Sequence, residues 1–206
     1  MARYRGPKNR VARRFGVNIF GRKRNPLAHK PHAPGMHGTR RRKKSDYGIQ
    51  LEEKQKLKSV FGMISESQLR RYFDEAVRRE GNTRDLLLQL LECRLDVLVY
   101  RLRFASTIFA AQQLVAHGHI CVNGKRVKAR SFSVRPGMVI SVYDRSRQIK
   151  PVVESLKYST HTVPEYFEFN EKDLSGKLLS LPSMESISLP VELNLAMVCD
   201  FLAHSG

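Results

Sequence analysis

Residues 94–142 carry the clearest structural pattern of the chain, RLDVLVYRLRFASTIFAAQQLVAHGHICVNGKRVKARSFSVRPGMVISV. Four apolar residues near its start follow the spacing i, i+3, i+4, i+7, namely Leu95, Leu98, Val99 and Leu102. This spacing places the four side chains on one face of a helix. The pattern therefore predicts an amphipathic helix that buries this face against the rest of the segment.

A second helix and a hairpin are predicted directly afterwards. Ser106 or Thr107 can cap the start of the helix, and Gly118 is a favourable residue at its end. The pair Asn123-Gly124 separates two short strand-forming runs, and both turn positions tolerate a positive φ. A further strand is expected over residues 138–142. The segment therefore predicts a compact module of two helices packed on a small antiparallel sheet.

The polar positions of this module are basic. Residues 97–143 contain no Asp or Glu. The Lys and Arg residues at the ends of its elements and in its turns are Arg101, Arg103, Lys125, Arg126, Lys128, Arg130 and Arg135. Such a surface neutralises phosphate groups of nucleic acid, although a basic face on an ordinary α+β domain can also be simply solvated.

The composition of the whole chain favours a polyanionic partner. Its formal net charge is +18 over 206 residues, and 41% of the residues are hydrophobic. We therefore expect a folded protein that binds nucleic acid, rather than a disordered basic tail. No apolar run approaches the roughly 18 residues of a membrane span, so a soluble intracellular protein is expected. The cysteines, Cys93, Cys121 and Cys199, are widely spaced and are expected to be reduced.

The first 45 residues form a basic arm. They hold 15 of the 37 Lys and Arg residues and no Asp or Glu. Such a segment repels itself, so we expect it to be extended and poorly ordered without RNA, apart from a short helix over residues 8–15. His29, His32 and His37 have no cysteine partners in the arm, so neither a metal site nor a cofactor is predicted.

Residues 46–93 predict a small helical bundle. Ser65-Glu66-Ser67-Gln68 matches a capping box, and Gly81-Asn82-Thr83 separates that helix from the next. After the module, a helix is expected past Pro151, with strand candidates at residues 166–169, 178–181 and 195–198. The predicted organisation is an α+β protein with three parts: an extended basic arm (1–45), a helical domain (46–93, continued by 143–206) and an inserted module (94–142).

The module resembles the S-four RNA-binding domain. The residues that carry this resemblance are Arg94-Leu95-Asp96, Tyr100-Arg101, Gln113-Leu114-Val115, His119-Ile120 and Val122-Asn123-Gly124. The flanking segments are similar to bacterial and plastid ribosomal protein S-four, through residues 2–8, 34–38, 45–51 and 81–92. Many members of that family hold their N-terminal region with a cysteine-ligated zinc. Because those cysteines are absent here, the chain resembles the zinc-free form.

The resemblance implies a structural component of the small ribosomal subunit. Such a protein is a primary binder of 16S-type rRNA at a helix junction of the 5′ domain, where it nucleates assembly. The implied partners are ribosomal protein S-five, with which it contributes to translational accuracy, other small-subunit proteins, and mRNA near its entry path. The implied location is the cytoplasm, or the plastid for an organellar chain. No membrane partner, cofactor or homo-oligomer is expected.

The residues expected to contact RNA are basic, aromatic or amide side chains of the arm, the bundle and the module. They are Arg3, Tyr4, Arg5, Lys8, Arg13, Arg14, His37, Arg40, Arg41, Arg42, Lys43, Lys44, Tyr47, Lys54, Lys56, Arg101, Arg103, His117, His119, Asn123, Lys125, Arg126, Lys128 and Arg130.

Two alternatives would use the same module. A pseudouridine-synthase-like RNA-modifying enzyme would use the Asp of an Arg-Leu-Asp sequence as its nucleophile, but here Val97-Leu98-Val99 continues a helical stripe. We therefore predict that Asp96 holds a neighbouring arginine and that the chain is not an enzyme. A stand-alone RNA-binding factor would be shorter and would lack residues 1–50.

Overall fold

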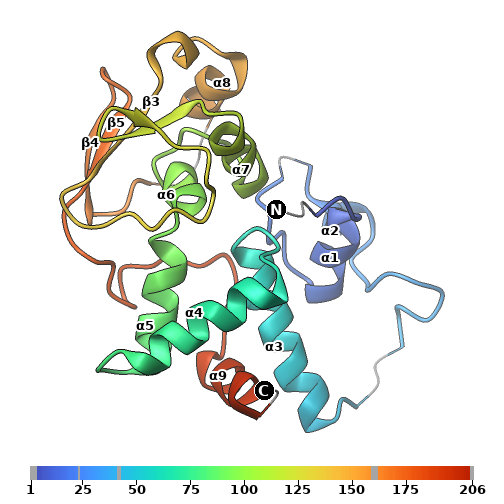
Figure 1. Ribbon diagram of the computed structural model, residues 1–206. Coiled ribbons are helices and arrows are strands. Elements are labelled where there is room, and N and C mark those ends of the chain that lie inside the picture. The colour runs from blue at the N-terminus through green and yellow to red at the C-terminus, as the bar shows by residue number, and fades with distance from the viewer. Residues whose placement is uncertain (1–3, 23, 41–42, 159–161, 205–206) are drawn as a thin grey trace. The chain divides into compact units, whose positions relative to one another are not determined.

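The structure, a computed structural model, describes residues 4–22, 24–40, 43–158 and 162–204 (Figure 1). The described residues form two compact units. The first unit contains the residues up to 87 together with those from 189 onward, and the second contains residues 88–188. None of the described helices combines the length and the apolar content that crossing a membrane requires.

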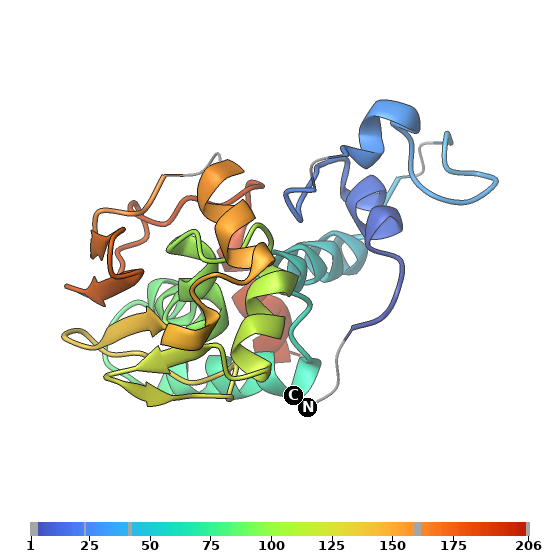
Figure 2. The same ribbon diagram turned by 90° about the horizontal axis from the view of Figure 1, so that it is seen from above.

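The first unit is helical. Its helices are α1 (Lys8–Phe15), α2 (Pro26–His29), α3 (Asp46–Val60), α4 (Glu66–Arg78) and α9 (Leu195–His204), and α5 (Thr83–Glu92) leads from this unit into the second. Helix α9 packs against α3 and also contacts α4 (Figure 2). The Ser65 hydroxyl accepts a hydrogen bond of 3.3 Å from the Gln68 amide, so the predicted cap of α4 is confirmed.

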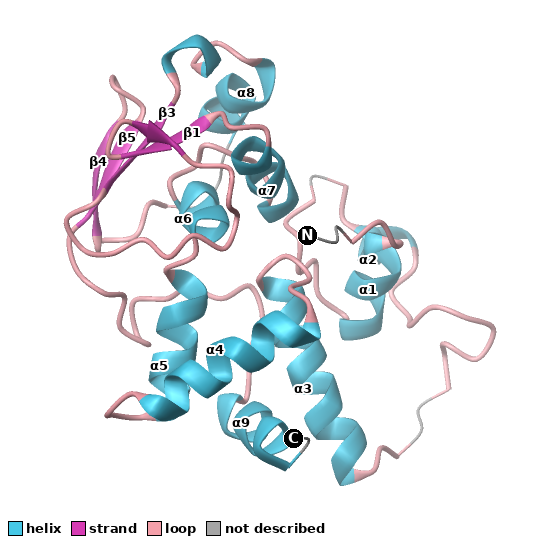
Figure 3. Ribbon diagram, viewed as in Figure 1, coloured by secondary structure: helices cyan, strands magenta, loops and turns pink. Residues whose placement is uncertain are grey.

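The second unit combines helices with a sheet. Its elements are α6 (Leu95–Arg101), α7 (Ile108–Ala116), β1 (Ile120–Val122), β2 (Lys125–Arg126), β3 (Val139–Val142), a 3₁₀ turn (Asp144–Ser146), α8 (Lys150–Tyr158), β4 (Phe167–Asn170) and β5 (Ser175–Leu178). Within the described residues the five strands form one antiparallel sheet in the order β2-β1-β3-β5-β4 (Figure 3). The α+β class and the module of two helices on a small sheet are confirmed.

The apolar face of α6 that the sequence predicted forms part of the core of the second unit. Leu95, Leu98, Val99 and Leu102 are all completely buried, together with residues of α7, β1 and β3. Thr107 caps α7, because its hydroxyl accepts a hydrogen bond from the Ala110 amide. The end of α6 lies close to β5, where a Cβ built on Gly176 would stand 2.3 Å from a methyl group of Leu102. Only glycine lets strand and helix approach this closely.

Two strand predictions near the C-terminal end were wrong. Residues 195–198 belong to helix α9, whose buried residues Leu195, Val198 and Leu202 repeat at helical spacing. A four-residue apolar run cannot distinguish helix from strand, and the helical period emerges only when Leu202 is included. In the run 178–181 only Leu178 lies in a strand, whereas Leu179 and Leu181 are about half exposed.

The structure also divides the chain differently from the predicted domains. Strands β4 and β5 join the sheet of the module, because β5 pairs with β3. Residues 143–188 therefore lie in the same unit as the module, and only the residues from 189 onward return to the helical unit. The short strand β5 has the sequence Ser-Gly-Lys-Leu, and its first three residues carry little strand preference, which left it unpredicted.

Candidate RNA interface

The hairpin of β1 and β2 is fixed by its turn. Asn123 and Gly124 have φ values of 48° and 77°, as the Asn-Gly pair predicts. The Asn123 amide donates to the Val139 carbonyl at 2.8 Å, and the Val139 amide donates to Oδ1 of Asn123 at the same distance. These two bonds tie the turn to β3, so the basic residues after the turn extend from a rigid support.

The next basic residues lie against the end of α7. Nε of Arg126 donates to the Gly118 carbonyl at 2.9 Å, and its guanidinium lies 4.5 Å from the ring centroid of Tyr143. A Cβ built on Gly118 would stand 3.1 Å from Nη2 of Arg126 and 3.2 Å from Cε of Lys128. Both cations therefore lie across this glycine, whose φ of +74° also favours the absence of a side chain.

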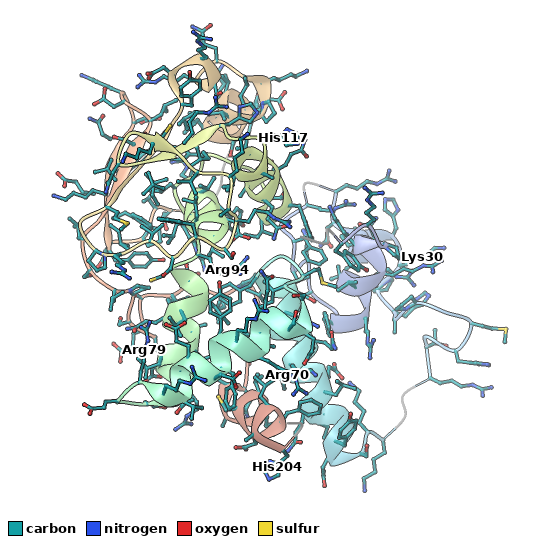
Figure 4. All side chains as sticks on the ribbon, viewed as in Figure 1. Lys30, Arg70, Arg79, Arg94, His117 and His204 are labelled. Carbon is teal, nitrogen blue, oxygen red and sulfur yellow. The ribbon has the colours of Figure 1, made fainter. Side chains whose placement is uncertain are left out.

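Two histidines flank the same glycine. The rings of His117 and His119 are 6.0 Å apart between centroids, and His117 is labelled at the end of α7 in Figure 4. Nδ1 of His119 lies 2.8 Å from the Ser146 hydroxyl. Burial lowers the pKa of His119, and the neighbouring His117 and Arg126 lower it further. We call the group His117, His119, Arg126, Lys128 and Tyr143 the Gly118 patch.

A buried network supports Arg130 behind the patch. The Asp96 carboxylate is fully buried and accepts two hydrogen bonds from Arg94, at 3.0 and 2.8 Å. Nε2 of Gln112 donates to the same carboxylate at 3.3 Å, and Oε1 of Gln112 accepts from Arg130 at 3.4 Å. The prediction that Asp96 holds a neighbouring arginine is confirmed. Its carboxylate is occupied by these donors and is not poised as a nucleophile.

The remaining cations of the module have no internal counter-charge. Among the described residues, no carboxylate pairs with Lys125, Arg126, Lys128, Arg130 or Arg135. The two nearest acids along the chain are engaged elsewhere, Asp96 with Arg94 and Asp144 with Arg147. Uncompensated positive charge therefore concentrates on the hairpin and on the loop that follows it.

Several residues predicted as RNA contacts are instead engaged inside the protein. Nε of Arg101 lies 2.5 Å from the buried Glu92 carboxylate, which also accepts a bond of 2.9 Å from the Tyr166 hydroxyl. Burial alone would lower the pKa of Arg101, but the Glu92 charge raises it above its usual value. Arg103 donates to the Leu156 carbonyl at 3.0 Å. These two arginines stabilise the second unit and are not part of the proposed interface.

Three lysines of the helical unit also pair with carboxylates of the protein, and of these Lys44 stays exposed. Nζ of Lys54 is 2.8 Å from Glu66 and 4.2 Å from the Phe201 ring centroid, and the residue is buried. Lys56 pairs with Glu53 at 2.6 Å, and Lys44 pairs with Glu52. Charge alone cannot distinguish such lysines from phosphate contacts, since the distinction depends on the acids that the fold brings near them.

The predicted contacts of the arm are mostly accessible. Arg5, Arg14, His37, Arg40 and Lys43 are exposed, whereas Tyr4, Lys8 and Arg13 are half-buried. Tyr47 is 64% exposed, with its ring 5.3 Å from that of Phe201. Arg3, Arg41 and Arg42 lie outside the described residues. No group of three His, Cys, Asp or Glu residues suited to a metal ion occurs in the described part of the chain.

Sequence reasoning missed two contributors to this surface. Tyr143 directly follows the predicted strand 138–142, and its ring supports Arg126. Gln112 orients Arg130 from the buried face of α7. The position of Tyr143 at a strand end offered a signal, whereas the role of Gln112 depends on a contact between residues 18 apart and had none.

Comparison with known proteins gives a consistent result across the chain. Residues 3–92 match the family model of the ribosomal protein S4/S9 N-terminal domain, and residues 93–140 match that of the S4 domain. The small ribosomal subunit protein uS4 of Protochlamydia amoebophila (strain UWE25) is 61% identical over 205 residues, covering 100% of both chains. The proteins of that name from Chlamydia pneumoniae and Chlamydia muridarum (strain MoPn / Nigg) are each 55% identical over 207 residues, covering 99% of both chains.

These matches extend over both units rather than over the module alone. They make the chain a structural component of the small ribosomal subunit with an RNA-binding S4 domain, not an enzyme. A full-length identity of this size leaves one conclusion: the chain belongs to the small ribosomal subunit protein uS4 family.

Proposed function

We propose that the chain binds 16S-type rRNA through the Gly118 patch, the hairpin turn and the basic arm. The observation that carries this proposal is the group of five module cations without a carboxylate partner among the described residues. Lys125 and Arg126 extend from a hairpin that Asn123 ties to β3 through its backbone amide and its side chain, and the other three lie in the loop that follows. Because the side chains of Arg126 and Arg130 are already held by hydrogen bonds, little ordering entropy opposes their contacts with phosphates.

The chemistry of the surface favours recognition of RNA by shape. Lys and Arg donate to phosphate oxygens, and the exposed Asn123 and His117 side chains suit ribose hydroxyls. Side chains cannot reach the base edges in the deep major groove of an A-form helix. A rigid basic surface of this kind therefore suits a junction of RNA helices, where phosphates of different strands converge.

We further propose the family's wider role for this chain. It binds early at the 5′-domain junction and nucleates assembly, and with ribosomal protein S-five it contributes to translational accuracy near the entry path of mRNA. Its membership of the uS4 family supports this role. Its location is then the ribosome in the cytoplasm, or in the plastid for an organellar chain, and it acts as a single copy without a homo-oligomer.

Sedimentation of a cell lysate tests the proposal. The tagged chain is expected to co-sediment with small-subunit particles, and purified chain is expected to bind the isolated 5′ domain of 16S-type rRNA more tightly than an unrelated duplex of equal length. A chain found only in the free pool, or one with no preference between the two RNAs, contradicts the proposed function.

A further inference from the structure

A pocket of the second unit is lined by residues that directly precede β4. It encloses a volume of about 710 Å³. Its walls come from the end of α6, from residues 162–165 and from residues between 185 and 188. The polar side chains among the lining residues are those of Arg101, Thr162, Glu165, Glu185, Ser186 and Ser188.

The positive charge in the wall of this pocket is already neutralised. Nε of Arg101 lies 2.5 Å from the carboxylate of Glu92, which is completely buried and also accepts from the Tyr166 hydroxyl. Glu165 and Glu185 are exposed, and among the described residues no cation pairs with either of them. The pocket therefore carries a net negative charge and suits an ammonium or guanidinium group rather than a phosphate.

Hydrogen bonds close the turns that carry the two glutamates. The Phe167 amide donates to the Pro164 carbonyl at 3.1 Å, across Glu165. The Ser186 hydroxyl donates to the Ser183 carbonyl at 2.8 Å, and the Ser186 amide donates to the Ser183 hydroxyl at 3.3 Å, across Glu185. The backbone that carries both carboxylates is therefore held before a ligand binds, which lowers the entropic cost of binding.

Strand β4 offers an unpaired edge directly after the pocket residues. It is the outer strand of the sheet, and within the described residues it pairs only with β5 (Figure 3). The Leu179 amide donates to the Tyr166 carbonyl at 2.9 Å, and hydrogen bonds alternate along an antiparallel pair. The backbone groups of Phe169 and the carbonyl of Phe167 therefore point away from β5, where an extended chain can pair with them.

The surroundings of this edge are acidic, in a chain whose formal net charge is +18. Residues 162–188 contain two lysines, Lys172 and Lys177, against five exposed acids, Glu165, Glu168, Glu171, Asp173 and Glu185. The strand at the opposite edge of the same sheet, β2, consists of Lys125 and Arg126. The sheet therefore has a basic edge that attracts phosphates and an acidic edge that repels them.

We propose that the β4 edge and its pocket form a docking surface for a Lys- or Arg-rich segment of another protein. The segment adds a strand to β4 and inserts one basic side chain between Glu165 and Glu185. Main-chain hydrogen bonds to Phe169 supply affinity, and the carboxylates select positive charge. This surface is separate from the Gly118 patch, and its use does not depend on the proposed rRNA binding.

Photo-cross-linking in cells tests which molecule lies on this surface. A tagged full-length chain carries benzoylphenylalanine in place of the exposed Glu171, which directly follows β4. The cells are irradiated, and the cross-linked peptides are sequenced. We expect a cross-link to a protein segment in which Lys and Arg outnumber Asp and Glu. A cross-link to RNA, a cross-link to an acidic or neutral segment, or no cross-link at all overturns the proposal.

The cross-linked segment, synthesised as a peptide, then tests the geometry on the purified full-length chain. Binding should slow hydrogen exchange of the Phe169 amide, followed by NMR, roughly tenfold or more. The pocket variant Glu165→Gln/Glu185→Gln should bind the peptide about tenfold more weakly, the scale of one charged hydrogen bond. The control Asp74→Asn/Glu80→Gln removes two exposed acids of the first unit and should bind like the wild type. Unchanged exchange of the Phe169 amide, or equal affinities of pocket and control variants, contradicts the proposal.

Discussion

The guanidinium of Arg94 and the carboxylate of Asp96 form a two-point ion pair that is almost completely removed from solvent. It lies where the chain before α6 pairs with residues 130–134, since the Leu95 amide donates to the Phe132 carbonyl and the Val134 amide to the Cys93 carbonyl. These backbone hydrogen bonds join the start of α6 to the loop that carries Lys128 and Arg130, and the ion pair lies at this junction.

Removing the charge of Asp96 should destabilise the protein strongly. Asp96→Asn leaves the Arg94 charge buried without its partner, which costs about 3–5 kcal/mol of unfolding free energy. Asp144→Asn is the control, because its ion pair with Arg147 is exposed and contributes at most about 1 kcal/mol. Urea unfolding measures both. An Asp96→Asn chain as stable as the control would show that the pair does not hold the module together.

Gly118→Ala should weaken RNA binding by more than its effect on stability explains. The new Cβ meets Arg126 and Lys128, and the positive φ adds strain of roughly 1–2 kcal/mol. Gly137→Ala is a matched control, because Gly137 also has a positive φ but a Cβ there meets no atom within 4 Å. We expect similar losses of stability in thermal unfolding, with rRNA affinity reduced clearly only for Gly118→Ala. Equal rRNA affinities of the Gly118→Ala and Gly137→Ala chains would show that Arg126 and Lys128 do not belong to the interface.

RNA binding should strengthen as the pH falls. In the free chain the pKa of His119 is lowered, chiefly by burial, whereas bound phosphates favour its charged form and raise the pKa again. Binding therefore takes up protons, and affinity rises as the pH decreases toward and below about 6.5. Stability of the free chain changes in the opposite direction. The contribution of His119 is fully present above its unfolded pKa and is lost as the pH falls toward the lowered folded value.

Binding isotherms at several pH values test this linkage. His119→Gln should flatten the pH dependence, whereas His204→Gln, at the exposed end of α9, should leave it unchanged. A pH dependence that survives in His119→Gln would assign the proton uptake to another group.

Lys54→Met should reduce stability without reducing RNA affinity. The Lys54 ammonium is buried against Phe201 and pairs with Glu66. Burial by itself raises the pKa of Glu66, but hydrogen bonds from Lys54 and Lys58 outweigh it and lower the pKa. We expect a loss of about 1–2 kcal/mol in urea unfolding. A loss of rRNA affinity at unchanged stability would instead support the sequence-based prediction that Lys54 contacts RNA.

Local patterns of the sequence predicted the helices and the hairpin of the module. They did not predict the contacts between residues that are far apart in sequence. The apolar stripe of α6, the Thr107 cap and the Asn123-Gly124 turn each depend on residues a few positions apart, and each was found. The pairing of β5 with β3 joins residues far apart in sequence, and no local pattern indicates it. Contacts between distant residues also explain why Lys54 pairs with an acid of the protein whereas Lys128, among the described residues, does not. Both are lysines of the predicted RNA-contact set, but the fold brings Glu66 to Lys54 and brings no carboxylate to Lys128 within the described residues.

The most direct test of the account compares three charge-matched variants for binding to the rRNA 5′ domain across a salt series. They are the patch variant Arg126→Gln/Lys128→Gln, the arm variant Arg40→Gln/Lys43→Gln and the control Arg78→Gln/Arg84→Gln. The patch variant should lose about tenfold to a hundredfold in affinity, and its salt slope should fall by roughly 1.4 to 1.8. The arm variant should lose less, because neighbouring cations can substitute, and the control should lose little. A clearly larger loss in the arm variant, or equal losses in all three, would contradict the claim that the Gly118 patch is the principal contact with RNA.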